Sequence, residues 1–401
     1  MIRGILARAA AGAALVCAAT VVAPTPASAV GTTGVRRVID GFSINQGWRV
    51  DRHLRILADI TGDGRADIVG FGGDGVTTAV SNGDGTFTLV FEASHDFGFD
   101  QGWRIPTNPR FVTDVTGDGR ADIVGIGNNA VMVAVALGNG GFAAPLTIGN
   151  GFLPGSSYFM ADVNADNRAD LYRVSQGRVD IAVALGNGSF AAPILATTEF
   201  SFPFAFDTPK VQDVTGDRRA EFLAFSVSGP IHIRSTSPRT DGTYPLSHSA
   251  QPNVASTPQL MDTFADITGD GRADIVAFGQ TEAESHSAVS IGGGNFRDFA
   301  VASDGFGAGS GWNRQHPRQV IDLNADGRAD IVGFGIQGVW IALSNGNGTF
   351  APGQLLVGDL GSDQGWNVDQ HVRVAADITG DGRADMVGFG AAGVYTAVTT
   401  P

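Results

Sequence analysis

Short apolar runs alternate with glycine-rich turns along the chain from about residue 30 onward. The run from Ala66 to Phe71 is followed by a second run from Val76 to Val80, and then by a turn and a further apolar segment. Runs of this length between turn residues predict β-strands, and the apolar positions show no helical period. The sequence therefore predicts an all-β protein.

One nine-residue pattern, DITGDGRAD in its commonest form, recurs along the chain. It begins at Asp59, Asp114, Asp162, Asp213, Asp266, Asp322 and Asp377, at intervals of 48 to 56 residues. This period suits a four-stranded antiparallel sheet, and such sheets arranged radially form a β-propeller. Most repeats also contain a hairpin turn that leads to an aromatic residue, at 139–142, 187–190, 241–244 and 347–350. We therefore expect a seven-bladed propeller with four antiparallel strands in each blade.

The two ends of the repeat array are complementary. The last repeat stops at Thr400 without a fourth strand, whereas a surplus apolar segment, Val35 to Ile39, precedes the first repeat. This segment stands at the same offset before Trp48 as residues 353–357 before Trp366. We expect the N-terminal strand to complete the last blade and close the ring.

Residues 1–29 differ from the repeats. Arg3 and Arg8 precede an apolar stretch that ends in the small residues 27–29, a pattern typical of a secretory signal peptide. We therefore expect cleavage after Ala29, a propeller domain over residues 30–401, and a secreted, extracellular protein.

Charge and composition exclude two classes of partner. The chain has 26 basic and 40 acidic residues, a net charge of -14, and no basic stripe that could follow a phosphate backbone. No apolar run after the leader is long enough to span a bilayer. We expect neither nucleic-acid binding nor membrane insertion.

The nine-residue pattern has the composition of a cation loop. Oxygen side chains at positions 1, 3, 5 and 9, a carbonyl at position 7 and glycine at position 6 are what Ca²⁺ requires. Arg218 replaces that glycine in the fourth loop, whereas Asn167 in the third is tolerated. The expected calcium ligands are Asp59, Thr61, Asp63, Arg65 (carbonyl) and Asp67; Asp114, Thr116, Asp118, Arg120 and Asp122; Asp162, Asn164, Asp166 and Asp170; Asp266, Thr268, Asp270, Arg272 and Asp274; Asp322, Asn324, Asp326, Arg328 and Asp330; and Asp377, Thr379, Asp381, Arg383 and Asp385.

An alternative explains the same aspartates without a cation. Aspartate side chains in turns often accept hydrogen bonds from their own backbone amides. Against this, a single turn needs one acid, whereas the pattern repeats three carboxylates at a fixed spacing, and these would repel one another without a cation between them.

A second element, with a tryptophan, precedes some of the loops. It contains Trp48 with His53 and Arg55, Trp103 with Arg110, Trp312 with His316 and Arg318, and Trp366 with His371 and Arg373. The third, fourth and fifth repeats lack it. An aromatic ring beside polar groups is suited to holding a sugar. Alternatively, the tryptophan fills the gap between blades and the arginine bridges to neighbouring loop carboxylates.

The repeat DITGDGRADIVGFG resembles the FG-GAP or VCBS repeat of integrin α-subunit heads. Together with the DQGW and HPR segments, it is also similar to the Psathyrella velutina-type lectins, which bind N-acetylglucosamine. This second resemblance implies sugar sites at Trp48, Trp312 and Trp366, each with its histidine and arginine. Trp103 with Arg110 departs from this pattern, because Asn108 stands where the others have histidine.

We therefore expect a calcium-stabilised lectin that binds glycans containing N-acetylglucosamine, such as chitin or peptidoglycan, at several sites. The alternatives are an integrin-like module that binds an extracellular protein and a polysaccharide hydrolase or lyase. The chain has no motif of a nucleophilic or metal-dependent hydrolase, so we expect no enzymatic activity.

Overall fold

The computed structural model describes residues 30–149, 156–175, 178–198, 206–226, 233–236, 248–250 and 261–401. The expected signal peptide and the hairpin at 241–244 lie outside these residues. Helices in the described part of the chain are limited to three-residue 3-10 turns, η1 (Ile44–Gln46), η2 (Ala308–Ser310) and η3 (Ser362–Gln364), and none could cross a membrane.

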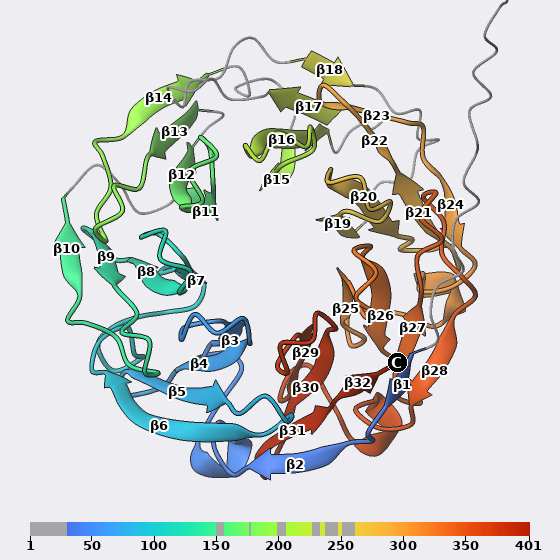
Figure 1. Ribbon diagram of the computed structural model, residues 1–401, viewed down its shortest axis with the longest axis horizontal. Coiled ribbons are helices and arrows are strands. Elements are labelled where there is room, and N and C mark those ends of the chain that lie inside the picture. Colours follow the sequence, from blue (N-terminus) through green and yellow to red (C-terminus); the bar gives the residue numbers. More distant parts are fainter. Residues whose placement is uncertain are drawn as a thin grey trace, which may run out of the picture.

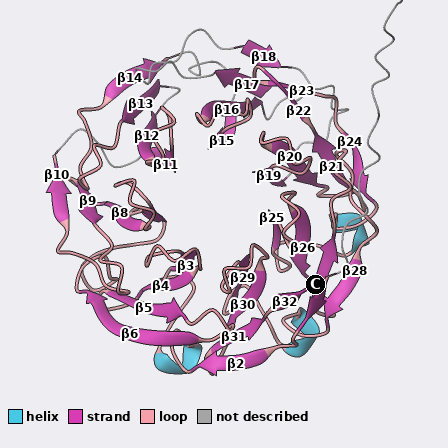
Figure 2. Cartoon of the chain, viewed as in Figure 1, coloured by secondary structure: helices cyan, strands magenta, loops and turns pink. Residues whose placement is uncertain are grey.

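The described residues form seven four-stranded antiparallel sheets arranged around a central opening (Figures 1 and 2). We call each sheet a blade and name it after its innermost strand. The β3 blade contains β3 (Arg55–Ala58), β4 (Asp67–Phe71), β5 (Val76–Ser81) and β6 (Phe87–Ser94); the β7 blade contains β7 (Arg110–Thr113), β8 (Asp122–Ile126), β9 (Val131–Ala134) and β10 (Leu146–Ile148); the β11 blade contains β11 (Ser157–Ala161), β12 (Asp170–Ser175), β13 (Arg178–Ala182) and β14 (Ile194–Thr197).

The remaining blades follow in chain order. The β15 blade contains β15 (Phe206–Gln212), β16 (Glu221–Ser226), β17 (Ile233–Thr236) and β18 (His248–Ala250); the β19 blade contains β19 (Met261–Ala265), β20 (Asp274–Phe278), β21 (Ser285–Ala288) and β24 (Ala300–Ser303); the β25 blade contains β25 (Arg318–Ile321), β26 (Asp330–Phe334), β27 (Val339–Ala342) and β28 (Gln354–Val357); the β29 blade contains β29 (Val372–Ala376), β30 (Asp385–Phe389), β31 (Val394–Ala397) and β2 (Arg36–Ile39). The expected all-β propeller with antiparallel four-stranded blades is confirmed.

The N-terminal strand closes the ring as predicted. Strand β2 pairs antiparallel with β31, so a strand near the N-terminal end of the repeats forms the outer edge of the last blade. A short second pairing, β1 (Gly31–Thr32) with β32 (Thr399–Thr400), adds to this closure. A further two-stranded sheet joins β22 (Ser290–Gly292) and β23 (Asn295–Phe296). The hairpin turns at 139–142, 187–190 and 347–350 each close with a bridge to the aromatic residue.

Strand burial follows from position in the blade. The second strand of five blades is buried along its whole length, namely β4, β8, β20, β26 and β30. Its near-continuous apolar sequence packs against the neighbouring blades on both faces. Outer strands such as β6 and β10 alternate or are exposed. The hydrophobic core is therefore distributed between blades rather than gathered at one centre.

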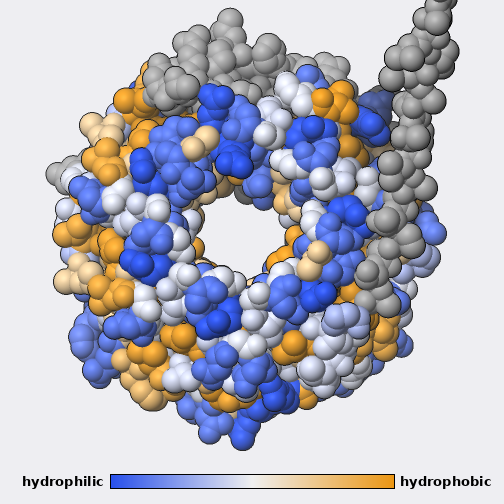
Figure 3. Space-filling model, in the orientation of Figure 1, coloured by the Kyte–Doolittle hydropathy of each residue, from blue (hydrophilic) through white to orange (hydrophobic). Residues whose placement is uncertain are grey.

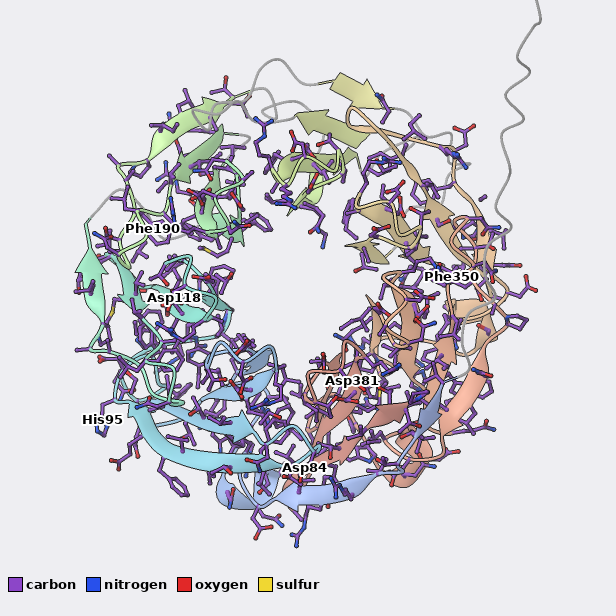
Figure 4. All side chains as sticks on the ribbon, viewed as in Figure 1. Asp84, His95, Asp118, Phe190, Phe350 and Asp381 are labelled. Atoms are coloured by element: carbon purple, nitrogen blue, oxygen red, sulfur yellow. The ribbon has the colours of Figure 1, made fainter. Side chains whose placement is uncertain are left out.

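The nonapeptide loops are joined to one another by one hydrogen bond at each junction. In each loop the alanine N–H donates to the carbonyl of the first aspartate of the preceding loop, at 2.7–2.9 Å. The donors are Ala66, Ala121, Ala169, Ala220, Ala273, Ala329 and Ala384, and the acceptors, in the same order, are Asp377, Asp59, Asp114, Asp162, Asp213, Asp266 and Asp322. Because Ala66 of the first loop bonds to Asp377 of the last, these bonds form a closed belt. Figure 4 labels Asp118 and Asp381, which belong to two of these loops, on the inner part of the ring, and hydrophilic residues predominate around the opening on the face shown in Figure 3.

Candidate functional site

In four blades, the loop before the innermost strand carries a tryptophan whose indole lies on a glycine of the second strand. A Cβ added to Gly70 would lie 2.6 Å from Trp48 Cη2, closer than real atoms approach. The other pairs are Gly125 with Trp103 (2.5 Å), Gly333 with Trp312 (2.5 Å) and Gly388 with Trp366 (2.7 Å). The indole can therefore occupy this place only because the facing residue is a glycine.

This pairing explains why three repeats lack the tryptophan. At the position of the glycine, the β11, β15 and β19 blades carry Arg173, Ala224 and Ala277, respectively. The side chain of Arg173 or Ala277 would occupy the space of the indole. Absence of the tryptophan from three blades is thus matched by a change in its packing partner, and does not by itself show that the residue is free for binding.

The arginine of the motif connects blades. Its Nη1 donates to the carbonyl of a non-glycine residue in the left-handed region, a backbone conformation that costs about 1–3 kcal/mol. The pairs are Arg55 with Phe42, Arg110 with Phe97, Arg318 with Phe306 and Arg373 with Leu360, and the acceptors have φ of 61°, 66°, 69° and 63°. The same guanidinium groups lie 4.9–6.0 Å from ring centres of the preceding blade, those of Phe389, Phe71, Phe278 and Phe334.

The histidine of the motif orders the turn after the tryptophan. Nδ1 of His53 accepts the N–H of Arg49 at 3.1 Å, and Nδ1 of His371 accepts that of Asn367 at 3.1 Å. In the β7 blade Asn108 Oδ1 accepts the equivalent N–H of Arg104 at 3.2 Å, so asparagine performs the same task. Acceptance at Nδ1 assigns the proton of the neutral ring to Nε2.

The histidines are neutral at physiological pH. Burial, followed by Arg55 and Arg52, lowers the pKa of His53 below its ordinary value of 6.5. Burial and the nearby Arg373 also lower the pKa of His316. Each ring therefore offers an Nε2–H donor rather than a positive charge.

Two pockets of similar size contain a tryptophan and a histidine of the motif. The first, of about 610 Å³, is lined by Trp312 and His316, with Trp340 and Phe350 among its other walls. The second, of about 600 Å³, is lined by Trp48 and His53, with Phe91 and His95 at its rim. Figure 4 shows Phe350 where the β19 and β25 blades meet and His95 at the outer edge of the ring. Both volumes fall in the range of roughly 300–1,000 Å³ that is usual for small-molecule sites.

The other predicted sugar-site residues do not line these two pockets. Trp103 and Trp366 are only 7% and 8% exposed, and Tyr395 packs edge-on against Trp366 at 5.5 Å. The four arginines, Arg55, Arg110, Arg318 and Arg373, point to backbone carbonyls instead. The structure therefore brings Trp48 with His53 and Trp312 with His316 into pockets, and places the remaining residues in packing between blades.

Two pocket residues could not be found from the motif. Trp340, the one tryptophan outside it, stands in β27 opposite Gly333, and Phe91 stands in β6. Neither has a residue of the same type at the equivalent strand position of the other blade, so no repeat pattern identified them.

In the loops, the first aspartate is held by the chain itself. Asp59 Oδ1 accepts the N–H groups of Thr61, Gly62 and Asp63, and its Oδ2 accepts that of Gly64 at 2.7 Å. The same pattern recurs at Asp114, Asp162, Asp266 and Asp377. This arrangement corresponds to the turn alternative of the sequence analysis.

The fifth and ninth loop positions also have protein partners. Asp63 pairs with Arg65 of its own loop, and the fully buried Asp67 accepts the N–H groups of Ile60 at 3.1 Å and Ser81 at 2.7 Å. Burial raises the pKa of Asp67 to about 6 and that of Asp330 to about 7. These carboxylates therefore tie each loop to the third strand of its blade.

The donor chemistry of the loops fits a hard cation, because it consists of oxygen atoms alone. Among the described residues, one set of three carboxylates has oxygen atoms within 4.8 Å of one another, namely Asp213, Asp217 and Glu221. This set belongs to the fourth loop, which the sequence analysis left out of the expected ligands because Arg218 replaces the glycine.

Comparison with known proteins identifies the family. The FG-GAP-like repeat model matches residues 114–173 and 322–388, and no curated protein matches the chain. A solved structure of an Agrocybe aegerita lectin, described as specifically recognising non-reducing terminal N-acetylglucosamine, is 30% identical; the match covers 90% of this chain and 88% of that one, with a TM-score of 0.51. A Photorhabdus luminescens Tc holotoxin structure, at 15% identity over 81% of this chain and 16% of its own, has a TM-score of 0.50 and shows the fold alone. The chain belongs to the family of FG-GAP-like repeat β-propellers that includes the Agrocybe aegerita lectin.

Proposed function

We propose that the protein is a secreted, seven-bladed, multivalent lectin for glycans that contain N-acetylglucosamine, as in chitin or peptidoglycan. The observation that carries this proposal is the repetition of one pocket, with a half-buried indole beside a neutral histidine, at two places on the ring. Among the relatives, the Agrocybe aegerita lectin supports the choice of sugar.

The two sites combine an apolar surface with a hydrogen-bond donor. The indole of Trp48 or Trp312 stacks on the apolar C–H face of a sugar ring, and Nε2–H of His53 or His316 donates to a hydroxyl or carbonyl oxygen. Both side chains are fixed by the packing described above, so little ordering is needed on binding. Two sites on one rigid ring also give avidity towards a polymeric glycan.

We further propose that calcium stabilises the nonapeptide loops, with the aspartates of positions 1, 5 and 9 as ligands. A cation held between these carboxylates would reduce their mutual repulsion. Because a ligand that binds only the folded state stabilises it, EDTA is expected to lower the melting temperature and calcium to restore it. An unchanged melting temperature together with an absence of bound metal would leave the aspartates as turn-forming residues only.

The test of the lectin proposal uses residues 30–401 on a glycan array, followed by calorimetry with N-acetylglucosamine. Trp48→Ala and Trp312→Ala are each expected to remove one site. Trp366→Ala is the matched control, because it also removes an indole from a glycine but lines neither pocket. The control is expected to lower stability and keep both sites.

The alternatives give different results in the same assays. A folded protein that binds no glycan would overturn the lectin and favour a protein-binding module like the integrin heads. Release of new reducing ends or unsaturated products from a bound glycan would identify a hydrolase or lyase instead.

A further inference from the structure

The outer strand of the β3 blade contains an enlarged bulge. Val76 pairs with Ser94 and Thr78 with Val90, so the single residue Thr77 of β5 faces the three residues 91–93 of β6. The corresponding step in the β25 blade leaves one residue, Leu356, unpaired between Leu355 and Val357. A bulge changes the direction of the side chains that it carries, and bulges are frequent at sheet edges and beside active sites.

The bulge presents an aromatic ring to solvent. Phe91 is 74% exposed, the highest value for a large apolar side chain among the described residues. The next residue, Glu92, adopts a φ of 57°, a left-handed conformation that is uncommon for a non-glycine residue. Ala93 points inward and is only 7% exposed. The chain therefore turns Phe91 and Glu92 outward at this point while keeping the strand attached to the core.

Phe91 belongs to the wall of the Trp48 pocket. Both residues line it, together with Glu92 and His95, and Trp48 is the more deeply buried of the two rings. The pocket thus has an indole at its base and a phenyl ring at its mouth. Glu92 and His95 add exposed polar groups, with 4.0 Å between Oε2 and Nε2.

The equivalent pocket obtains its second aromatic residue from another element. In the β25 blade Trp340 stands opposite Gly333, and a Cβ added to Gly335 would meet both Trp312 at 3.0 Å and Trp340 at 3.3 Å. In the β3 blade the residue opposite Gly70 is Thr77, which has no ring. The bulge of β6 therefore supplies an aromatic wall in a blade where the third strand does not.

We propose that Phe91 forms a second sugar subsite at the mouth of the Trp48 pocket, so that this pocket binds a glycan of at least two sugar units. The terminal unit lies on Trp48, and the next unit stacks on Phe91 as the glycan leaves the pocket. This inference rests on the proposed lectin function. It adds that the Trp48 pocket distinguishes an oligosaccharide from a single sugar.

The experiment compares N-acetylglucosamine with its disaccharide, chitobiose, by calorimetry in a Trp312→Ala background that silences the other pocket. Phe91→Ala is expected to weaken chitobiose binding by about fivefold, in keeping with the loss of one stacking contact, and to leave binding of the single sugar unchanged. Phe91→Tyr is expected to retain chitobiose binding. Leu146→Ala, which removes an exposed apolar side chain of β10 outside both pockets, serves as the control.

The outcomes separate this inference from the proposal beneath it. If the background protein binds both sugars and Phe91→Ala changes neither affinity, or both equally, the subsite is overturned and the lectin stands. If wild-type protein binds neither sugar, the lectin proposal is itself overturned. Should Trp312→Ala fail to fold, the same comparison with Trp340→Thr as the background gives the answer, because Trp340 also lines the Trp312 pocket.

Discussion

The β25 and β11 blades share strand order and register, but they differ in the contacts at the fourth residue of the second strand. In the β25 blade Gly333 of the second strand stands opposite Trp340, and the indole of Trp312 covers the glycine. In the β11 blade Arg173 takes the place of the glycine and stands opposite Asp180. Arg173 Nη2 and Asp180 Oδ2 are 2.6 Å apart, and the Asp180 side chain is 2% exposed.

This difference shows that the propeller backbone accepts either of two contacts at one position: an indole packed on a glycine, or a buried ion pair. Packing of the indole requires the glycine, and in two blades the indole lies at the base of a pocket. The ion pair instead places a guanidinium where the other blade has the indole. Candidate sugar sites are therefore restricted to blades that keep the glycine.

The largest effect is expected from breaking the ion pair between Arg173 and Asp180 in the β11 blade. Burial alone would raise the pKa of Asp180, but hydrogen bonds from Arg178 and Arg173 hold it below its ordinary value, so the carboxylate is charged. Asp180→Ala removes the buried carboxylate that Arg173 and Arg178 share, and it is expected to lower the free energy of unfolding by about 3–5 kcal/mol. Denaturant unfolding measures this change. Arg178→Ala removes a half-exposed partner and should lower the free energy of unfolding far less than Asp180→Ala does.

A smaller effect is expected from disturbing the packing of Trp312 on Gly333. Gly333→Ala places a methyl group where Trp312 lies, so the indole must move; overpacking of this kind costs about 1–3 kcal/mol. Binding at the Trp312 pocket should be lost while the Trp48 pocket is retained. Calorimetry with N-acetylglucosamine measures the number of sites. Gly358→Ala is the control, because no atom lies within 4 Å of its added Cβ, and loss of a site in that variant would contradict the explanation.

The smallest effect concerns the histidines. Burial, followed by Arg373 and Arg55, lowers the pKa of His371 below its ordinary value of 6.5. A depressed pKa in the folded state means that this contribution to stability is present above pH 6.5 and is lost as the pH falls through 6.5 towards the folded-state value. His371→Asn, which copies Asn108 of the β7 blade, should be nearly as stable as wild type at pH 7.5 and less sensitive to acid. Thermal melts at pH 5.5 and 7.5 measure this; equal acid sensitivity would show that His371 is not the titrating group.

The sequence predicted the arrangement of the blades because the signals for it are local. Turn residues, strand runs and the period of the loops each lie within one repeat, and the surplus segment from Val35 to Ile39 matched the missing strand in spacing. The pairing of β2 with β31 confirmed that match. Such features depend on the order of residues along the chain more than on contacts between distant parts.

The site was predicted only in part, because side-chain direction depends on partners from other blades. Arg55 has the composition of a sugar ligand, yet its guanidinium turns inward to Phe42 and Phe389. Phe91 was missed because its exposure follows from the strand register of β5 and β6. The dependence of tryptophan on glycine was present in the sequence, since each repeat with the motif has Gly at the fourth position of its second strand and the others do not.

The belt of hydrogen bonds from alanine to aspartate limits how far neighbouring blades can separate, and the Trp312 pocket lies between two such blades. The Trp312 pocket is walled by Val301 and Ser303 of one blade and by Trp312 and Trp340 of the next. At that junction the N–H of Ala329 is bonded to the carbonyl of Asp266 at 2.8 Å. Widening the pocket would require this link to stretch, and a closed loop of links passes such a strain to every other junction. We therefore expect the width of the Trp312 pocket to change little when a ligand binds.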